Sequence, residues 1–324
     1  MKRRSLVTTA VNVTLGAALP WSWRASLAAE DYPARPVQVI VPYAPGGADV
    51  YIRPMQPMLE KRHNLRLVIE SVVGAGGTVG SARVKRSAPD GYTLLFCGSG
   101  AFTIAPRLQA TGAPVAADFI PLVNIATVPY IIATRKGSAI RDTRGLIDFI
   151  KSNPGALNYG SPGIGSSPHL GMEALARNLG SSVTHVAYSG IATAMQALLG
   201  GHIEAVIGAP STVLPQMQNG AVTGIVLASK DRFPLAPDLP TLADVGIDID
   251  VSTHFAFYAP KGTPQPVVAK LSMALGDVAA DPTFKQALES TRTLVDVLPS
   301  DVLARVLGEE QVRFGPMIAA VKNP

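Results

Sequence analysis

The sequence predicts an α/β protein with two domains, parallel-rich sheets flanked by helices, and a ligand cleft between the domains. Short β-rich runs alternate with helical patterns along most of the 324 residues, and continuous apolar strands are typical of parallel sheets covered on both faces. About 295 residues remain after an N-terminal export signal, more than one hydrophobic core normally holds. Glycine- and serine-rich loops follow strands in both halves, and ligands bind at such strand ends.

Nine apolar runs are predicted to form strands. They lie at residues 37–43, 65–71, 92–98, 130–135, 156–161, 183–188, 203–209, 224–229 and 255–260. Helical patterns separate many of them, for example "DTRGLIDFIKSNPG", where Asp142 or Thr143 is the expected N-cap and Pro154–Gly155 the expected end.

Residues 1–29 are predicted to be a secretory signal peptide. Lys2, Arg3 and Arg4 precede an apolar run, and small residues at Ala28 and Ala29 suit cleavage. The ordinary export route and the twin-arginine route both fit this start. The sequence therefore predicts a protein that acts outside the cytoplasm.

Removing this signal changes the charge of the chain. The signal holds four of the 28 basic residues and no acidic one, which leaves 24 basic against 23 acidic residues. A net charge of +1 gives no support to nucleic-acid binding, which needs clustered lysine and arginine. The five histidines lack metal-ligand spacing, and the single Cys97 is expected at a buried strand end.

The stretch "NYGSPGIGSSPHLGMEAL" permits three kinds of site. As a nucleophile loop it lacks the first glycine of Gly-x-Ser-x-Gly, because Tyr159 stands there. A secreted serine hydrolase using Ser166 or Ser167 with His169 nevertheless remains an alternative. As a nucleotide loop its glycine spacing matches neither the Rossmann fingerprint nor the P-loop.

An anion cradle fits the stretch best. Ser167 is the expected N-cap of a helix that starts at Pro168, and a helix N-terminus offers free N–H groups to a carboxylate. Gly165 lets the backbone approach a ligand, and Ser161 or Ser166 can donate a hydroxyl. Phosphate and sulfate fit the same physics, and a capped helix without a ligand is the simpler alternative.

"PYAPGGAD" repeats this arrangement in the other half of the chain. A strand ends, Gly46–Gly47 follows, and a helix is expected to begin. Two facing helix N-termini would hold the anionic groups of one small molecule. His185 and Tyr188 lie at a strand end, where a structural hydrogen bond is expected, and His254 lies near a possible hinge.

The chain resembles the Bug-type receptors of tripartite tricarboxylate transporters over almost its whole length. The motifs that carry the resemblance occur in one order: "YPARPVQVIVPYAPGG", "VIESVVGAGGTVGSARV", "APDGYTLL", "LNYGSPGIGSSPHL", "HVAYSGIATAMQALLGGHIEAV", "DLPTLADVGI" and "FYAPKGTP". The resemblance implies a type II-like periplasmic-binding-protein fold that closes on a ligand without catalysis. One domain would comprise residues 30–126 and 254–324, and the other residues 127–253.

The resemblance also implies the ligand, the partner and the ligand-binding loops. The ligand would be a small organic acid, either a di- or tricarboxylate or an aromatic carboxylate. The partner would be a membrane permease, and a receptor that reports to a sensor protein is a further possibility. No cofactor is expected, and the protein is expected to be a periplasmic monomer. The expected ligand-binding residues are Tyr43, Gly46, Gly47, Ala48, Ser99, Ala101, Ser161, Gly165, Ser166, Ser167, His169 and Tyr188.

Some positions depart from the family pattern. The chain is one residue shorter at Ala48, and Pro54 and Pro57 interrupt a segment that is commonly helical. Ala197 stands where an acidic residue is frequent, which disfavours an amine-bearing ligand. If Tyr43 and Phe102 lined the pocket, they would favour a flat or long apolar acid.

Overall fold

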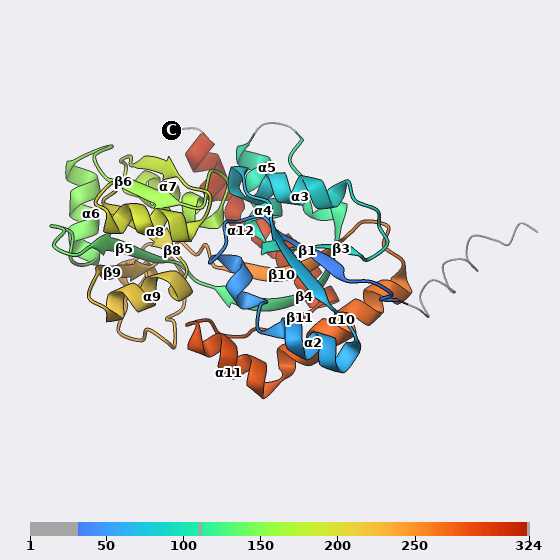
Figure 1. Cartoon of the computed structure of the whole chain (residues 1–324). Coiled ribbons are helices and arrows are strands. Elements are labelled where there is room, and N and C mark those ends of the chain that lie inside the picture. The colour runs from blue at the N-terminus through green and yellow to red at the C-terminus, as the bar shows by residue number, and fades with distance from the viewer. Residues whose placement is uncertain (1–31, 110–111, 323–324) are drawn as a thin grey trace, which may run out of the picture.

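The computed structural model describes residues 32–109 and 112–322 of the chain (Figure 1). The predicted signal peptide at residues 1–29 lies outside the described residues. In the part that the structure describes, no helix is both long and apolar enough to cross a membrane.

The first sheet has six strands in the order β11-β4-β10-β3-β1-β2. Its strands are β1 (Val37–Val41), β2 (Leu67–Ser71), β3 (Thr93–Gly98), β4 (Phe119–Val128), β10 (Thr253–Pro260) and β11 (Leu298–Pro299). The surrounding helices are α2 (Met55–His63), α3 (Thr78–Lys85), α4 (Gly100–Thr103), α5 (Ala105–Leu108), α10 (Gln265–Ala280), α11 (Pro282–Ser290) and α12 (Ser300–Lys322).

The second sheet has five strands in the order β7-β6-β8-β5-β9. Its strands are β5 (Ile131–Arg135), β6 (Asn158–Ser161), β7 (Thr184–Ala187), β8 (Ala205–Gly208) and β9 (Val222–Leu227). Helices α6 (Thr143–Ser152), α7 (Ser167–Asn178), α8 (Ile191–Leu199) and α9 (Pro210–Gln218) accompany it. Short 3-10 helices are η1 (Ala48–Tyr51), η2 (Ala75–Gly77), η3 (Ala116–Asp118) and η4 (Ala243–Val245).

Each sheet is mixed, and the predicted parallel pairing holds for only part of it. Strand β1 pairs in parallel with β2 and β3, and β6 pairs in parallel with β7 and β8. The remaining pairs are antiparallel, because β10 returns beside β3 and β4, while β5 runs opposite to β8 and β9. The strand β4 is not among the predicted runs.

The chain passes between the sheets twice, after β4 and again before β10. Helix α12 contacts both β4 of the first sheet and α7 beside the second (Figure 1). Cys97 is fully buried near the end of β3, as predicted, and is a free thiol. Pro54 precedes α2 and Pro57 lies in its first turn, where the missing N–H groups have no intrahelical partner to lose.

Candidate functional site

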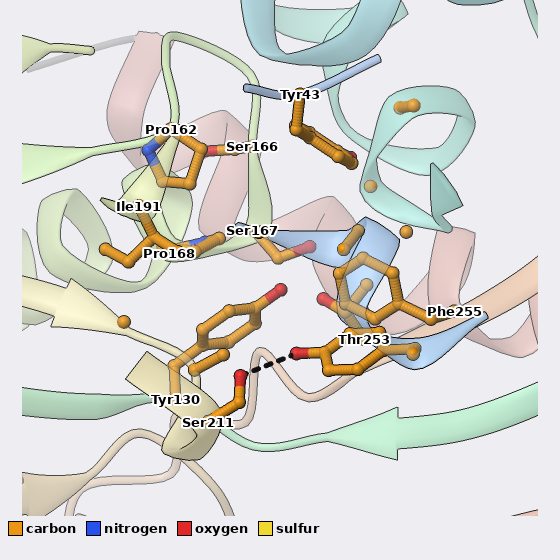
Figure 2. Close-up of a pocket in the computed structure, with 18 residues that line it drawn as sticks. Tyr43, Tyr130, Pro162, Ser166, Ser167, Pro168, Ile191, Ser211, Thr253 and Phe255 are labelled. Atoms are coloured by element: carbon orange, nitrogen blue, oxygen red, sulfur yellow. Dashed lines mark hydrogen bonds between the residues drawn. The ribbon is translucent and has the colours of Figure 1, made fainter. Parts of the chain in front are cut away.

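A cavity lies between the two sheets and is partly open to solvent (Figure 2). The cavity adjoins loops that follow β1, β3, β6 and β8, where α/β sheets bind ligands. Its lining is Tyr43, Gly47, Ala48, Tyr51, Gly98, Gly100, Ala101, Tyr130, Pro162, Ser166, Ser167, Pro168, Ile191, Gly208, Ala209, Ser211, Thr253 and Phe255.

The predicted ligand-binding residues divide into two groups. Those that line the cavity are Tyr43, Gly47, Ala48, Ala101, Ser166 and Ser167. Those that lie outside its lining are Gly46, Ser99, Ser161, Gly165, His169 and Tyr188. The backbone or side chain of each residue in the second group contacts other parts of the protein.

Helix α7 begins one residue earlier than predicted, so Ser166 rather than Ser167 is its N-cap. Ser166 is the last residue with extended backbone, and its Oγ accepts a hydrogen bond from the His169 N–H at 3.4 Å. The same hydroxyl donates to the Gly163 carbonyl at 2.7 Å. Pro168 lies in the first turn of the helix, where proline fits without the loss of a bond.

The hydroxyl and the backbone N–H of Ser167 are two donors that contact no acceptor among the described residues. Its side chain is buried, with 2% of the residue exposed, and Oγ has no hydrogen-bond partner among the described residues. Its N–H, one of the first in α7, also has no partner in the described part of the chain. Figure 2 shows the hydroxyl directed into the cavity. Buried polar groups are normally satisfied, so this one points to a missing binding partner.

The Gly46–Gly47 loop is arranged differently from the prediction. The helix that follows is η1, a 3-10 helix of four residues. The Gly46 N–H donates to Asp49 Oδ1 at 2.8 Å, and Arg53 Nε donates to Asp49 Oδ2 at 2.8 Å. Asp49 is itself 1% exposed. The carboxylate of Asp49 therefore occupies the donors of this loop. The second helix N-terminus that was expected to be free for a ligand is not present in this described segment.

Ser99 lies behind the cavity in a buried hydrogen-bond network. Its Oγ donates to Glu310 Oε1 at 2.9 Å, and Thr103 Oγ1 donates to Glu310 Oε2 at 3.3 Å. His254 Nδ1 lies 2.6 Å from Glu310 Oε1. These contacts fix α12 to β10 where the chain returns to the first sheet, so Ser99 and His254 serve the fold.

Ser161 and His185 form the structural hydrogen bond expected at that strand end, with 2.7 Å between Oγ and Nε2. The His185 ring lies 4.5 Å from that of His169, centroid to centroid. Burial is the main cause that lowers the pKa of His169 to about 3, with His185 contributing, and it lowers the pKa of His185 to about 4. Tyr188 lies over Gly160, where a Cβ would meet its ring at 3.1 Å.

The serine–histidine pair of a hydrolase is not assembled in the described residues. The Ser166 hydroxyl bonds to the Gly163 carbonyl, and the Ser167 hydroxyl bonds to nothing. His169 Nδ1 accepts from the Gly165 N–H at 3.5 Å. An activated serine needs a hydrogen bond to a base that can take its proton near neutral pH, and an imidazole with a pKa of about 3 is a poor one.

Aromatic and aliphatic side chains make up much of the lining. Phe255 packs edge-on against Tyr51, with ring centroids 5.1 Å apart, and against Tyr43 at 6.4 Å. Tyr130 directs its ring into the same space (Figure 2). Burial raises the pKa of each of these three tyrosines, that of Tyr51 to about 12. They therefore present neutral hydroxyls to a ligand.

Several lining residues were not predicted, and Phe102, for which the sequence left lining and packing roles open, is a packing residue. Phe102 packs against Phe119 and Tyr258 inside the first sheet's core. Among the missed lining residues are Tyr51, Tyr130, Ile191, Gly208, Ala209, Ser211, Thr253 and Phe255. Ile191 and Ser211 lie at helix starts that follow strands, so the rule that sites gather at strand ends could have found these two. Tyr130, Thr253 and Phe255 lie at or next to the starts of strands, which that rule does not cover.

Two sets of contacts join the loops across the rim of the cavity. The Ala44 N–H donates to the Ser189 carbonyl at 3.1 Å. Gln109 Nε2 donates to the Ala75 carbonyl at 2.9 Å and to the Ile164 carbonyl at 2.5 Å. Ala44 and Gln109 belong to segments of the first sheet, whereas Ser189 and Ile164 belong to the second. These bonds hold the two sides together.

The fold is that of periplasmic binding proteins. The structure superimposes on the periplasmic binding protein BugD with a TM-score of 0.83 at 30% identity, covering 90% of this chain and 99% of that one. It matches MatC from Rhodopseudomonas palustris with bound malate equally well, with a TM-score of 0.83 at 30% identity and coverage of 89% and 100%.

The family follows from the sequence itself. Residues 52–322 match the model of the tripartite tricarboxylate transporter family receptor. A UPF0065 protein of Bordetella pertussis is 31% identical over 296 residues, covering 90% of this chain and 91% of that protein. The chain belongs to the tripartite tricarboxylate transporter receptor family, as its resemblance predicted.

Proposed function

We propose that this protein is an extracytoplasmic receptor that binds one small organic carboxylate between its two sheets and delivers it to a membrane permease, without catalysis. The observation that carries the proposal is the Ser167 hydroxyl, which is buried, has no hydrogen-bond partner among the described residues, and is directed into the cavity at the N-terminus of α7. Family membership supports the receptor role. The malate bound to MatC supports a carboxylate as ligand.

The carboxylate would lie against the first turn of α7. There Ser167 offers a hydroxyl and a backbone N–H, and the helix adds a partial positive charge. Both donors strengthen when the acceptor is ionised, because charge-assisted hydrogen bonds are about twice as strong as neutral ones. Closure of both sides around the ligand would exclude water, which would strengthen the same interactions.

Binding would be coupled to closure of two lobes. The proposed lobes are residues 30–126 with 254–324, and residues 127–253, joined at the two crossings between the sheets. The Ala44–Ser189 and Gln109–Ile164 bonds would form on closure, so a ligand that contacts both lobes shifts the population toward the closed form. The closed form is the one that a permease would recognise.

A ligand screen tests this function. Thermal unfolding of the purified monomer is measured with and without mono-, di- and tricarboxylates, and native mass spectrometry looks for a co-purified acid. A ligand that binds only the folded form raises the stability by about 2.7 kcal/mol at one hundred times its dissociation constant. One acid bound per chain with a raised unfolding temperature is expected. If no carboxylate shifts the transition or co-purifies, the proposed function is wrong.

A further inference from the structure

We infer that Glu310 is a positioning residue for ligand binding, which from helix α12 holds the turn at the start of α4 against Ser167. This inference rests on the proposed function, because it assumes that a carboxylate lies beside Ser167 at the N-terminus of α7. Glu310 lies outside the cavity lining, so it acts through the residues that it holds.

Glu310 is a buried carboxylate on α12, with 2% of the residue exposed. Its Oε1 accepts a hydrogen bond from Ser99 Oγ at 2.9 Å and lies 2.6 Å from His254 Nδ1. Its Oε2 lies 3.3 Å from Thr103 Oγ1. An apolar side chain of similar volume would fill this place without the cost of burying a charge. What the carboxylate adds is therefore a fixed geometry rather than net stability.

The contacts of Glu310 lead to a turn that is too short to hold its own position. Helix α4 comprises only four residues, Gly100–Thr103, and Ser99 immediately precedes it. So short a helix is not stable by itself. Glu310 contacts both of its ends, and His254 of β10 adds two bonds: its N–H donates to Ser99 Oγ at 3.2 Å, and its carbonyl accepts from the Ser99 N–H at 2.9 Å. The turn is thus held by α12 and β10 together.

The same turn lies directly against Ser167. A Cβ added at Gly100 would lie 2.5 Å from Ser167 Oγ and 3.2 Å from the Ser167 backbone nitrogen. Gly100 and Ala101 also line the cavity. A small displacement of the turn would therefore change the room that a carboxylate has beside Ser167. Because hydrogen bonds weaken steeply with poor geometry, the position of this turn determines how well Ser167 can bond to the ligand.

Helix α12 also holds the second crossing between the sheets. Arg313 of this helix donates through Nη1 to Asp250 Oδ2 at 2.9 Å and through Nη2 to the Ser252 carbonyl at 3.3 Å. Val251 packs against α7, where a Cβ at Gly171 would meet Val251 Cγ2 at 2.7 Å. The helix itself contacts both α4 and α7 (Figure 1). One helix thus positions the α4 turn relative to the segment that packs on α7.

Calorimetric titration of Glu310→Leu tests the inference, with malate, adipate and benzoate as probes and the wild-type protein titrated alongside. Leucine fills the space but accepts no hydrogen bond, so the α4 turn loses the group that holds it. The dissociation constant of each acid that the wild type binds is expected to rise at least about tenfold, with the number of sites per chain unchanged. A merely structural role would instead lower the number of sites and leave the dissociation constant of the folded fraction unchanged.

Glu310→Gln is the conservative variant, and Glu309→Leu is the matched control at an exposed position of the same helix. Glutamine Oε1 can still accept from Ser99 and His254, and its Nε2 can donate to Thr103 Oγ1, so it should recover most of the affinity that leucine loses. Glu309→Leu should change the affinity by no more than about twofold. Wild-type affinity in Glu310→Leu, or equally weak binding by Glu310→Leu and Glu310→Gln, would overturn the inference.

Hydrogen exchange of the ligand-free proteins gives a second test that needs no ligand. The Phe102 and Thr103 N–H groups donate to the Ser99 carbonyl at 2.9 and 3.0 Å. Glu310→Leu should speed exchange at these two amides at least about tenfold, while the amides of β1 keep their wild-type rates. Unchanged exchange at the turn in a folded Glu310→Leu protein would contradict the inference.

The two proposals fail in different ways. If the wild-type protein binds no carboxylate, the proposed function is wrong and the inference fails with it. If the wild type binds an acid and Glu310→Leu binds it equally well, only the inference is wrong. If Glu310→Leu does not fold, Ser99→Ala, which removes the same contact from the other side, replaces it in both measurements with the same expected direction.

Discussion

The loops after β1 and after β6 share a sequence pattern but differ in what they leave unbound. Both contain a glycine with left-handed backbone, Gly46 at φ +82° and Gly165 at φ +85°. In the first loop, Asp49 of the same segment accepts the Gly46 N–H. In the second, Ser166 caps α7, and the Ser167 hydroxyl has no partner in the part of the chain that the structure describes. A glycine loop before a helix can thus bind an anion only if no side chain of the same loop already accepts hydrogen bonds from its donor groups.

The two glycines should respond differently to substitution, and this is the largest expected effect. A Cβ at Gly165 would lie 2.9 Å from Ala105 Cα and 2.8 Å from Gln109 Nε2, whereas a Cβ at Gly46 would meet its nearest neighbour at 3.9 Å. Gly165→Ala should therefore weaken ligand binding by roughly 3 kcal/mol, combining backbone strain with a clash across the rim. Gly46→Ala should weaken ligand binding only through the backbone strain, by about 1–2 kcal/mol.

Calorimetric titration of both variants with the same acid decides this. Equal losses of affinity would show that contact across the rim adds nothing to the strain.

Asp49→Ala tests the self-contained loop. The substitution leaves the Gly46 N–H and the Arg53 guanidinium without the carboxylate that accepts their bonds, so it should lower the free energy of unfolding by about 1–3 kcal/mol in the absence of ligand. Denaturant unfolding of the ligand-free protein measures this. Ser152→Ala, at an exposed serine of α6, is the matched control. Stability equal to that of the control would mean that Asp49 does not organise the loop.

The adjacent histidines of α7 and β7, His169 and His185, predict how stability depends on pH. His169 and His185 have pKa values of about 3 and about 4 in the folded protein, below the ordinary 6.5. As the pH falls below about 6.5, the unfolded chain takes up protons that the folded chain does not, so stability decreases. The slope reaches about 1.4 kcal/mol per pH unit for each histidine.

Unfolding between pH 7 and pH 4 checks this slope. His185→Gln should give a shallower slope, and the exposed His202→Gln should keep the wild-type slope. Identical slopes in both variants would contradict the assignment.

Gln109→Ala should have a smaller effect. Gln109 donates to the Ala75 and Ile164 carbonyls, and the second of these bonds crosses the rim. Since Gln109 lies near the surface, its loss should weaken ligand binding by about 1 kcal/mol, with little change in the unfolding of the ligand-free protein. Stopped-flow binding should show the change as faster dissociation, because in the proposed closure this bond forms across the cavity. An unchanged dissociation rate would show that the Gln109 bond does not contribute to the proposed closure.

Much of the fold could be predicted from sequence, because its strands are short apolar runs bounded by turns. Strand β4 was missed since Pro121 and Asn124 interrupt its pattern. In the structure, the buried Asn124 side chain is satisfied because its Nδ2 donates to the Asp296 carbonyl at 2.7 Å. That partner lies 172 residues away in the sequence, and no local pattern reports it.

The candidate site was predicted less completely than the fold. Ser166 and Ser167 could be located near a helix start, but which of them caps α7 depends on one residue's backbone angles. Asp49 was not recognised as the internal partner of Gly46, although its position after the glycines is compatible with that contact. Tyr130 lies between β4 and β5, whereas Phe255 lies in β10 of the first sheet, far along the chain, and only the folded chain brings them together.

The affinity and stability of Ser167→Ala test the central claim most directly. The Ser167 hydroxyl bonds to nothing in the described protein, so removing it should leave the ligand-free unfolding temperature unchanged or slightly raised. Loss of its bond to a carboxylate should weaken binding by about 1.5–3 kcal/mol, roughly tenfold or more. Calorimetry and thermal unfolding on one preparation, with Ser152→Ala as control, give both quantities. Unchanged affinity, or a loss of ligand-free stability that accounts for the weaker binding, would contradict the account.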